Sequence, residues 1–259
     1  MGIITPKNQE VKQFKGVHLY HAGMSNCSMR VRITLDEKGV KWTSHHLDLR
    51  RAENITSEYF AIHPKGLVPT LIHDGTVIIE STDIIHYLDE TFPDPPLRPN
   101  DHKGRAQISR WLERASTNHM CVKTYMFGNQ IGPSMRKEKF ELARYRELQK
   151  NQELLVFHEK NSSAKGLPKK SLSKAAKVMR DCFQKLDNIL DDRDWIVGET
   201  FSLADIAWIP LYVTLNNAGF PFNDYQNVNR WKKTIQKRPS FSSAVLQWLP
   251  KDLMADNSF

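Results

Sequence analysis

Polar and nucleophilic side chains follow a short apolar strand near the start of the chain. The segment 24–32 reads MSNCSMRVR and contains four neighbouring donors: Ser25, Asn26, Cys27 and Ser28. Hydroxyl donors and the N-terminus of a helix both favour an anion. A site that lowers the pKa of a thiol by about one unit contributes roughly 1.4 kcal/mol to keeping the reactive thiolate. The segment therefore predicts a place where a thiol ionises and reacts.

A second informative stretch, residues 63–88, contains a hairpin. Two short β-branched runs, Thr70–His73 and Thr76–Ile79, flank the pair Asp74-Gly75. Asp-Gly readily adopts the positive φ angles that a two-residue hairpin turn requires. The two runs are therefore predicted to be adjacent antiparallel strands.

Two features that could bind a ligand flank this hairpin: exposed backbone groups before it and the start of a helix after it. Val68-Pro69 comes before it, and an X-Pro bond is the one peptide link that takes the cis form at low cost. A cis bond there turns the N–H and C=O of Val68 outward, where a peptide can pair with them. After the hairpin, Glu80 precedes Ser81, which we expect at the N-cap of the next helix, where an anion is favoured. Together these features predict a site for a small peptide with a free carboxylate.

The elements that position these residues alternate between strand and helix. We expect a strand at 17–20, a helix at 28–38 capped by Gly39, a strand at 41–49, a helix at 56–62, the hairpin, and a helix from Ser81 to Leu88. This βαβαββα order places helices on both faces of a small mixed sheet, which is the thioredoxin-like arrangement. The fold class is thus α/β in residues 1–92.

The rest of the chain is expected to be helical. Residues 93–100 are rich in proline and cannot continue a helix, so they are predicted to link the first domain to a second one at 101–259. Apolar residues recur three and four apart over 105–126, 137–157, 172–190 and from Ser202 onward. Ser202 and Asp205 have the spacing of a capping box, a role in folding. The second domain is predicted to be all-α.

Composition restricts the class of protein. The chain has 259 residues, 40% of them hydrophobic, and lacks the run of about 18 apolar residues that a membrane span needs. Three separated cysteines and unpatterned histidines predict neither a disulfide framework nor a metal site. The net charge of +8 includes a basic stretch at 160–180 without interleaved aromatic residues, so we expect a solvated face and no nucleic-acid or membrane partner. The expected location is the cytoplasm.

These motifs, in this order, resemble the glutathione-binding half of the cytosolic glutathione transferases. The resemblance implies that Val68 pairs with the cysteinyl backbone of glutathione, that Glu80 and Ser81 hold its γ-glutamyl end, and that Asn26 lies beside it. It also implies a thioredoxin-like domain followed by a helical domain that binds a small, hydrophobic electrophile. A homodimer is expected because the family usually pairs two subunits about a twofold axis.

Within that family the 24–32 segment is similar to the Ser-Ser-Cys-x-x-Arg-Val-Arg signature of zeta-class enzymes. This match implies that Ser25 is the hydroxyl that stabilises the thiolate and that Cys27 is a nearby thiol. The chain departs from the zeta pattern at Asn26, Met29 and Leu67, which weakens the expectation of zeta-type isomerisation.

Three alternatives stay open. In a match to omega-class enzymes the catalytic cysteine falls at Ser25, and a serine there argues against disulfide reduction. The bacterial β-etherases share the Glu-Ser-Thr helix start and an enlarged helical region like 137–177, and that match makes Ser28 the catalytic serine. A non-catalytic member of the fold would use these serines only as helix caps.

Overall fold

A five-stranded mixed sheet forms the centre of the N-terminal part in the computed structural model, which describes residues 2–253. Its strands, in spatial order, are β1 (Ile3–Ile4), β5 (Thr76–Ile78), β4 (Thr70–His73), β2 (Val17–His21) and β3 (Trp42–His46). β2 and β3 run parallel, whereas the other neighbours run antiparallel. The predicted hairpin is present, and its turn has positive φ at both Asp74 (46°) and Gly75 (79°). β1 was not predicted, because two residues are too few to show a strand pattern.

Helices cover both faces of this sheet, as the thioredoxin-like prediction requires. On one face α1 (Asn26–Glu37) and α3 (Ser81–Thr91) bury apolar residues against Leu19 and Leu71. On the other face α2 (Ser57–Ile62) packs Tyr59 and Ile62 against Ile72 and Val77. Because alternate residues of β4 point to opposite faces, Leu71 and Ile72 contribute to different cores.

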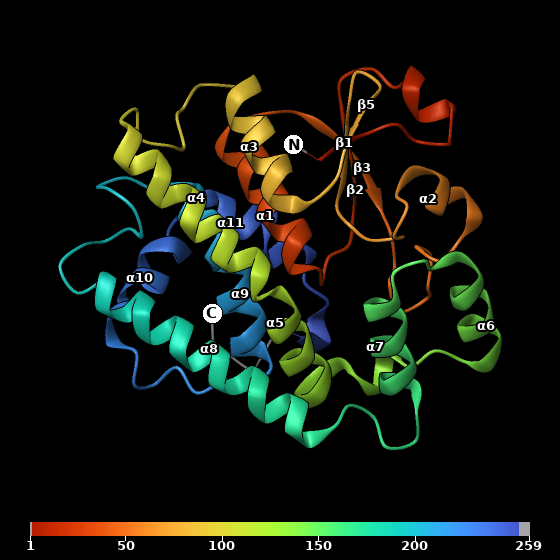
Figure 1. Cartoon of the computed structure of the whole chain (residues 1–259). Helices are drawn as coiled ribbons and strands as arrows, with labels where there is room; N and C mark the ends of the chain where they lie inside the picture. The colour runs from red at the N-terminus through yellow and green to blue at the C-terminus, as the bar shows by residue number, and fades with distance from the viewer. Residues whose placement is uncertain (1, 254–259) are drawn as a thin grey trace.

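The C-terminal part is helical. Its helices are α4 (His102–Thr117), α5 (His119–Met126), α6 (Lys139–Leu148), α7 (Gln152–Ser162), α8 (Lys169–Ile189), α9 (Leu203–Asn217), α10 (Gln226–Gln236) and α11 (Pro239–Ala244). A π-helical turn, Phe127–Ile131, follows α5 directly. None of the helices in the described range is long and apolar enough to cross a membrane. Figure 1 shows α9 in the middle of this part, with α6 and α7 set to one side of it below α2.

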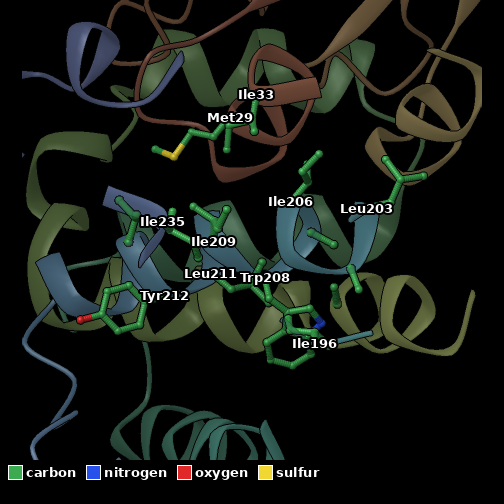
Figure 2. Close-up of a cluster of buried hydrophobic side chains, with 14 of the residues drawn as sticks. Met29, Ile33, Ile196, Leu203, Ile206, Trp208, Ile209, Leu211, Tyr212 and Ile235 are labelled. Atoms are coloured by element: carbon green, nitrogen blue, oxygen red, sulfur yellow. The ribbon is translucent and has the colours of Figure 1, made fainter. Parts of the chain in front are cut away.

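The main core is built around α9. Every residue from Leu203 to Leu215 is buried, and Figure 2 shows side chains of α9 gathered with Met29 and Ile33 of α1. The predicted capping box opens this helix: the Asp205 carboxylate accepts hydrogen bonds from the backbone N–H and the hydroxyl of Ser202. The same carboxylate also accepts from Trp231 Nε1, so it joins α9 to α10.

Several predicted element boundaries were wrong. α1 begins at Asn26, with Ser25 as its N-cap, and not at Ser28. In α3 the N-cap is Glu80, so Ser81 is the first helical residue. The expected helix at 105–126 is interrupted at Asn118, and the one at 137–157 is two helices. The second interruption occurs where Asn151 caps α7, because an asparagine side chain that bonds a free N–H favours a new helix start.

Two buried arginines of α1 join the N-terminal part to the helical part. Arg30 donates from Nε to the Ala207 carbonyl of α9, and Arg32 donates from Nε to the Ala244 carbonyl of α11. Both guanidinium groups are nearly inaccessible to solvent. The start of α1 is therefore held rigidly over α9, which fixes the position of the donors at its N-terminus.

Candidate active site

One cleft brings together six of the seven residues predicted to form the site. It is lined by Ser25, Asn26, Cys27, Val68, Glu80 and Ser81, together with residues of the helical part. The space between atoms in the cleft is about 1120 Å³, part of it open to solvent. Small-molecule sites are typically clefts with apolar walls and a few converging polar groups, and this cleft has both.

Ser25 places a hydroxyl at the N-terminus of α1. Its Oγ accepts a hydrogen bond from the backbone N–H of Ser28 at 3.2 Å. A serine hydroxyl accepts through lone pairs and keeps one proton to donate, so Ser25 can cap the helix and still donate to an anion in the cleft. The helix dipole favours the same negative charge.

Ser28 lies outside the cleft. Its side chain is completely buried, and its Oγ accepts from the backbone N–H of Ala22 at 3.3 Å. Because α1 begins two residues earlier than expected, Ser28 falls on the face of the first turn that packs inward. Asn26, although only 5% exposed, does line the cleft.

Cys27 is paired with a histidine from the helical part. Its Sγ lies 3.6 Å from Nδ1 of His119, the first residue of α5. Burial raises the pKa of the Cys27 thiol, but the positive charge of His119, its hydrogen bond, Arg30 and a hydrogen bond with Ser81 outweigh burial and lower that pKa to about 6. The surroundings of Cys27 therefore favour its thiolate form.

The loop before β4 forms another wall of the cleft. The Val68-Pro69 peptide bond is cis, as the sequence suggested. Nearby, Gly66 has φ +58°, and a Cβ there would lie 2.3 Å from the Phe60 ring, so the chain needs glycine for this approach. Asn54 Nδ2 donates to the Gly66 carbonyl at 2.7 Å and holds the loop in place.

Glu80 and Ser81 occupy the start of α3. Glu80 has φ +64°, which is uncommon for a residue other than glycine and often marks a functional site. Its carboxylate pairs with Lys65 Nζ at 2.9 Å. The Ser81 hydroxyl accepts a hydrogen bond from Arg30 Nη1 at 3.1 Å, while the buried Nη2 of Arg30 has no hydrogen-bond partner in the part of the chain that the structure describes. The helix start and this guanidinium make the Ser81 end of the cleft favourable for an anion.

The helical wall of the cleft contains residues that the sequence did not indicate. His119 and Lys123 come from consecutive turns of α5, Lys137 from the segment before α6, Tyr145 from α6 and His158 from α7. His119 and Lys123 are four residues apart and share a helix face, a spacing visible in the sequence. What the sequence could not show is that this face meets the N-terminus of α1.

Apolar side chains complete this wall. Phe127, Ile131 and Met135 line the cleft and belong to a small cluster that also includes Met24 and Phe157. In residues 2–253 no group of three or more His, Cys, Asp or Glu side chains could hold a metal ion. The cleft therefore has a polar half beside the α1 and α3 starts, and an apolar half with lysines and histidines from the helical part.

Two family models match the chain. Residues 19–96 match the family model described as glutathione S-transferase, N-terminal domain, and residues 136–239 match the model described as glutathione S-transferase, C-terminal domain.

Individual relatives span nearly the whole chain. Protein LigF of Sphingobium sp. (strain NBRC 103272 / SYK-6) is 30% identical over 249 residues, covering 91% of this chain and 95% of that protein. Glutathione S-transferase Z2 of Arabidopsis thaliana is 28% identical over 233 residues, covering 90% and 92%. The crystal structure of β-etherase LigF from Sphingobium sp. strain SYK-6 superposes with a TM-score of 0.80 at 26% identity, over 88% of this chain and 98% of that one. The fold, the matched models and these relatives show that the chain belongs to the glutathione S-transferase family, whose enzymes use glutathione as co-substrate.

Proposed function

We propose that this protein binds glutathione in the polar half of the cleft and activates its thiol for attack on a small electrophile in the apolar half. The observation that carries the proposal is the meeting of the Ser25 hydroxyl and the α1 N-terminus with Val68, Glu80 and Ser81 in one cleft.

The contacts to glutathione follow from the chemistry of each group. The backbone of Val68 pairs with the cysteinyl part of the tripeptide, in the manner of a strand edge. The Glu80 carboxylate attracts the γ-glutamyl ammonium, and Ser81 with the α3 N-terminus receives the γ-glutamyl carboxylate. Asn26 supplies an amide beside the ligand, and the unpartnered Nη2 of Arg30 adds positive charge behind Ser81.

Ser25 is assigned the role of stabilising the thiolate of bound glutathione. A hydroxyl that donates to the sulfur favours the charged form and lowers the pKa of the bound thiol. Cys27 has a secondary role, because it is a thiolate of its own beside His119 and shapes the electrostatics of the site. Ser28 is also secondary: with its side chain buried, it acts through the fold of the first helical turn.

The second candidate function is cleavage of β-aryl ethers. A relative that is 30% identical is LigF, and its crystal structure is titled a β-etherase. In such a reaction the glutathione sulfur forms a bond to the carbon that bears the aryl ether, and the C–O bond breaks to release a phenolate. Parallel assays with a chlorinated aromatic, a β-aryl ether and maleylacetoacetate, each with glutathione, separate general transfer, ether cleavage and zeta-type isomerisation. Glutathione binding without turnover of any of the three would favour a ligand-binding role.

The thiolate assignment is tested by absorbance of bound glutathione against pH, taken as the difference between protein with and without glutathione. Ser25→Ala should raise the pKa of the bound thiol by about one unit, if one hydroxyl bond supplies roughly 1.4 kcal/mol. Ser28→Ala and Cys27→Ala serve as neighbouring controls. A pKa that moves only in Ser28→Ala would transfer the role to Ser28.

The γ-glutamyl assignment is tested by calorimetric titration with glutathione. Ser81→Ala should weaken binding by about 1.5–3 kcal/mol, the typical value of hydrogen bonds to a charged group. Ser171→Ala, on the exposed face of α8, is the matched control and should bind normally. Equal affinities for all three proteins would remove Ser81 from the site.

The protein is proposed to act as a cytoplasmic homodimer, as its family usually does. Three cysteines, all without disulfides, are consistent with a reducing compartment. Light scattering at micromolar concentration should return twice the mass of one chain. The mass of a single chain would refute the dimer, and immunolocalisation outside the cytoplasm would refute the location.

A further inference from the structure

The helical wall of the cleft carries three basic side chains that the proposed thiol activation does not use. Lys123, Lys137 and His158 all line the cleft, and we call them the basic corner. They come from three segments: α5, the stretch before α6, and α7. Lys123 Nζ lies 3.2 Å from His158 Nε2, and the Lys137 ammonium lies 5.4 Å from the centroid of the Tyr145 ring.

The hydrogen bonding of His158 leaves a donor without an acceptor. An ammonium group can only donate, so Nε2 of His158 accepts from Lys123 and the ring proton is on Nδ1. His158 is only 8% exposed, and its Nδ1 has no hydrogen-bond partner among residues 2–253. Burial and the two lysines lower the pKa of His158 well below its usual range, so the ring is neutral at pH 7. The basic corner therefore contains two ammonium groups and a buried N–H, and a buried donor is normally matched by an acceptor.

Neither Lys123 nor Lys137 forms a close ion pair with a carboxylate in the described part of the chain, although Glu153 and Glu141 attract them from farther away. Among residues 2–253 neither ammonium has a carboxylate oxygen within 4.0 Å, whereas Lys65 pairs with Glu80 at 2.9 Å. Burial and the nearby Lys137 lower the pKa of Lys123 to about 8, while the charges of Cys27 and Glu153 act less strongly in the opposite direction. Two like charges held together in a partly buried place repel each other, so a further anion between them is favoured.

Apolar surfaces surround the basic corner. Lys123 Nζ lies 4.7 Å from the centroid of the Phe157 ring and 5.6 Å from that of Phe127. Ile131 and Met135 line the cleft beside them. Burial raises the pKa of Tyr145 to about 12, so its hydroxyl stays protonated next to Lys137. An anion in these surroundings is attracted more strongly than in water, because the effective dielectric constant is lower.

We propose that the basic corner binds a carboxylate of the electrophile, so that the second substrate is an aromatic acid whose apolar body lies on Phe127, Ile131 and Met135. The inference rests on the proposed function, because it needs glutathione in the polar half of the same cleft. It adds a substrate class: electrophiles with a carboxylate remote from the reacting carbon, in preference to their neutral analogues.

The test compares three ligands by calorimetric titration: glutathione, S-benzylglutathione and S-(4-carboxybenzyl)glutathione. The two conjugates differ only in the carboxylate. For the wild type we expect the carboxylate conjugate to bind about tenfold tighter or more, as charge-assisted hydrogen bonds in a desolvated place are the strong ones. Lys123→Met and Lys137→Met should each reduce this preference to about twofold or less. They remove the charge and keep the chain length, and circular dichroism checks that both variants fold.

Lys165→Met is the matched control, because Lys165 is exposed and outside the cleft. It should keep the full preference, and all three variants should bind glutathione itself like the wild type. If the wild type binds the two conjugates equally well, the inference is overturned and the proposed function is left standing. A preference that survives in both Lys123→Met and Lys137→Met would overturn it as well.

In a third pattern, Lys123→Met would weaken the binding of glutathione as much as the binding of the carboxylate conjugate. This result would assign the lysines to glutathione and reject a site for the carboxylate of the electrophile. If the wild type binds none of the three ligands, the proposed function fails, and the inference falls with it. The failure of the two proposals is thus distinguished by whether glutathione binds.

Discussion

Replacing His119 should change the reactivity of Cys27 more than any other property of the protein. The Sγ of Cys27 lies 3.6 Å from His119 Nδ1, and the pKa of this thiol is lowered from an ordinary 9.0 to about 6. A difference of about three units corresponds to roughly 4 kcal/mol in favour of the thiolate. Two unit charges about 4 Å apart near a protein surface interact by about 4 kcal/mol, so His119 can account for most of the effect.

His119→Leu removes the charge and the hydrogen bond and leaves the burial that raises the pKa. We therefore expect the pKa of Cys27 to return to about 8 or higher, with Arg30 as its remaining positive neighbour. At pH 7 a thiol with a pKa of about 6 is about 90% ionised, whereas one with a pKa of about 8 is about 10% ionised. The rate of alkylation at pH 7 should fall about tenfold or more.

The assay is alkylation by iodoacetamide from pH 5 to 10, with each cysteine followed by peptide mass spectrometry. In the wild type the rate at Cys27 should level off above about pH 7, while in the variant it should keep rising to about pH 9. Cys121 and Cys182 are internal references, since burial raises the pKa of both thiols. An exposed histidine variant, His102→Leu, controls for the substitution itself. Superimposable Cys27 profiles for wild type and His119→Leu would refute the reasoning.

Two further predictions concern stability. Asp205→Ala removes the acceptor of four buried hydrogen bonds, including those from Ser202 and Trp231. It should lower the free energy of unfolding, measured by urea titration, by about 3 kcal/mol or more. Asp224→Ala, at an exposed position, is the control and should have no comparable effect. Gln149→Ala removes the hydrogen bond from Nε2 to the Lys65 carbonyl at 2.9 Å. We expect faster amide hydrogen exchange in residues 139–162 and unchanged exchange in α9. Unchanged exchange in residues 139–162 would contradict a tethering role for Gln149.

The N-terminal fold could be predicted from the sequence because its signals are local. Asp74-Gly75 determines a turn by its own conformational preference, and an X-Pro bond marks a position where cis is accessible. The alternation of strand and helix then leaves few topologies, because parallel strands need a crossover connection. The capping box at Ser202 and Asp205 was predicted correctly for the same reason: both partners are within one turn.

The site was only half predictable, because its other half depends on tertiary contacts. Ser25 and Val68 belong to local motifs, whereas His119 and His158 reach the cleft only through the packing of α5 and α7. The burial of the Ser28 side chain was not predicted, because its direction depends on where α1 begins. A shift of two residues in that boundary turns a side chain from the cleft into the core, since successive helix positions are about 100° apart.

The α6–α7 region has a consequence for how substrate choice could change over time or by design. It supplies Tyr145 and His158 to the cleft, yet neither residue belongs to the main core around α9. It is tied to the thiol half by the hydrogen bond from Gln149 to Lys65 and by the apolar cluster in which Phe157 of α7 joins Met24. Exchanging this region for another of similar length should therefore alter which acceptor molecules react, while the activation of the glutathione thiol should stay unchanged. We therefore expect the selectivity for the acceptor to be separable from the activation of the thiol.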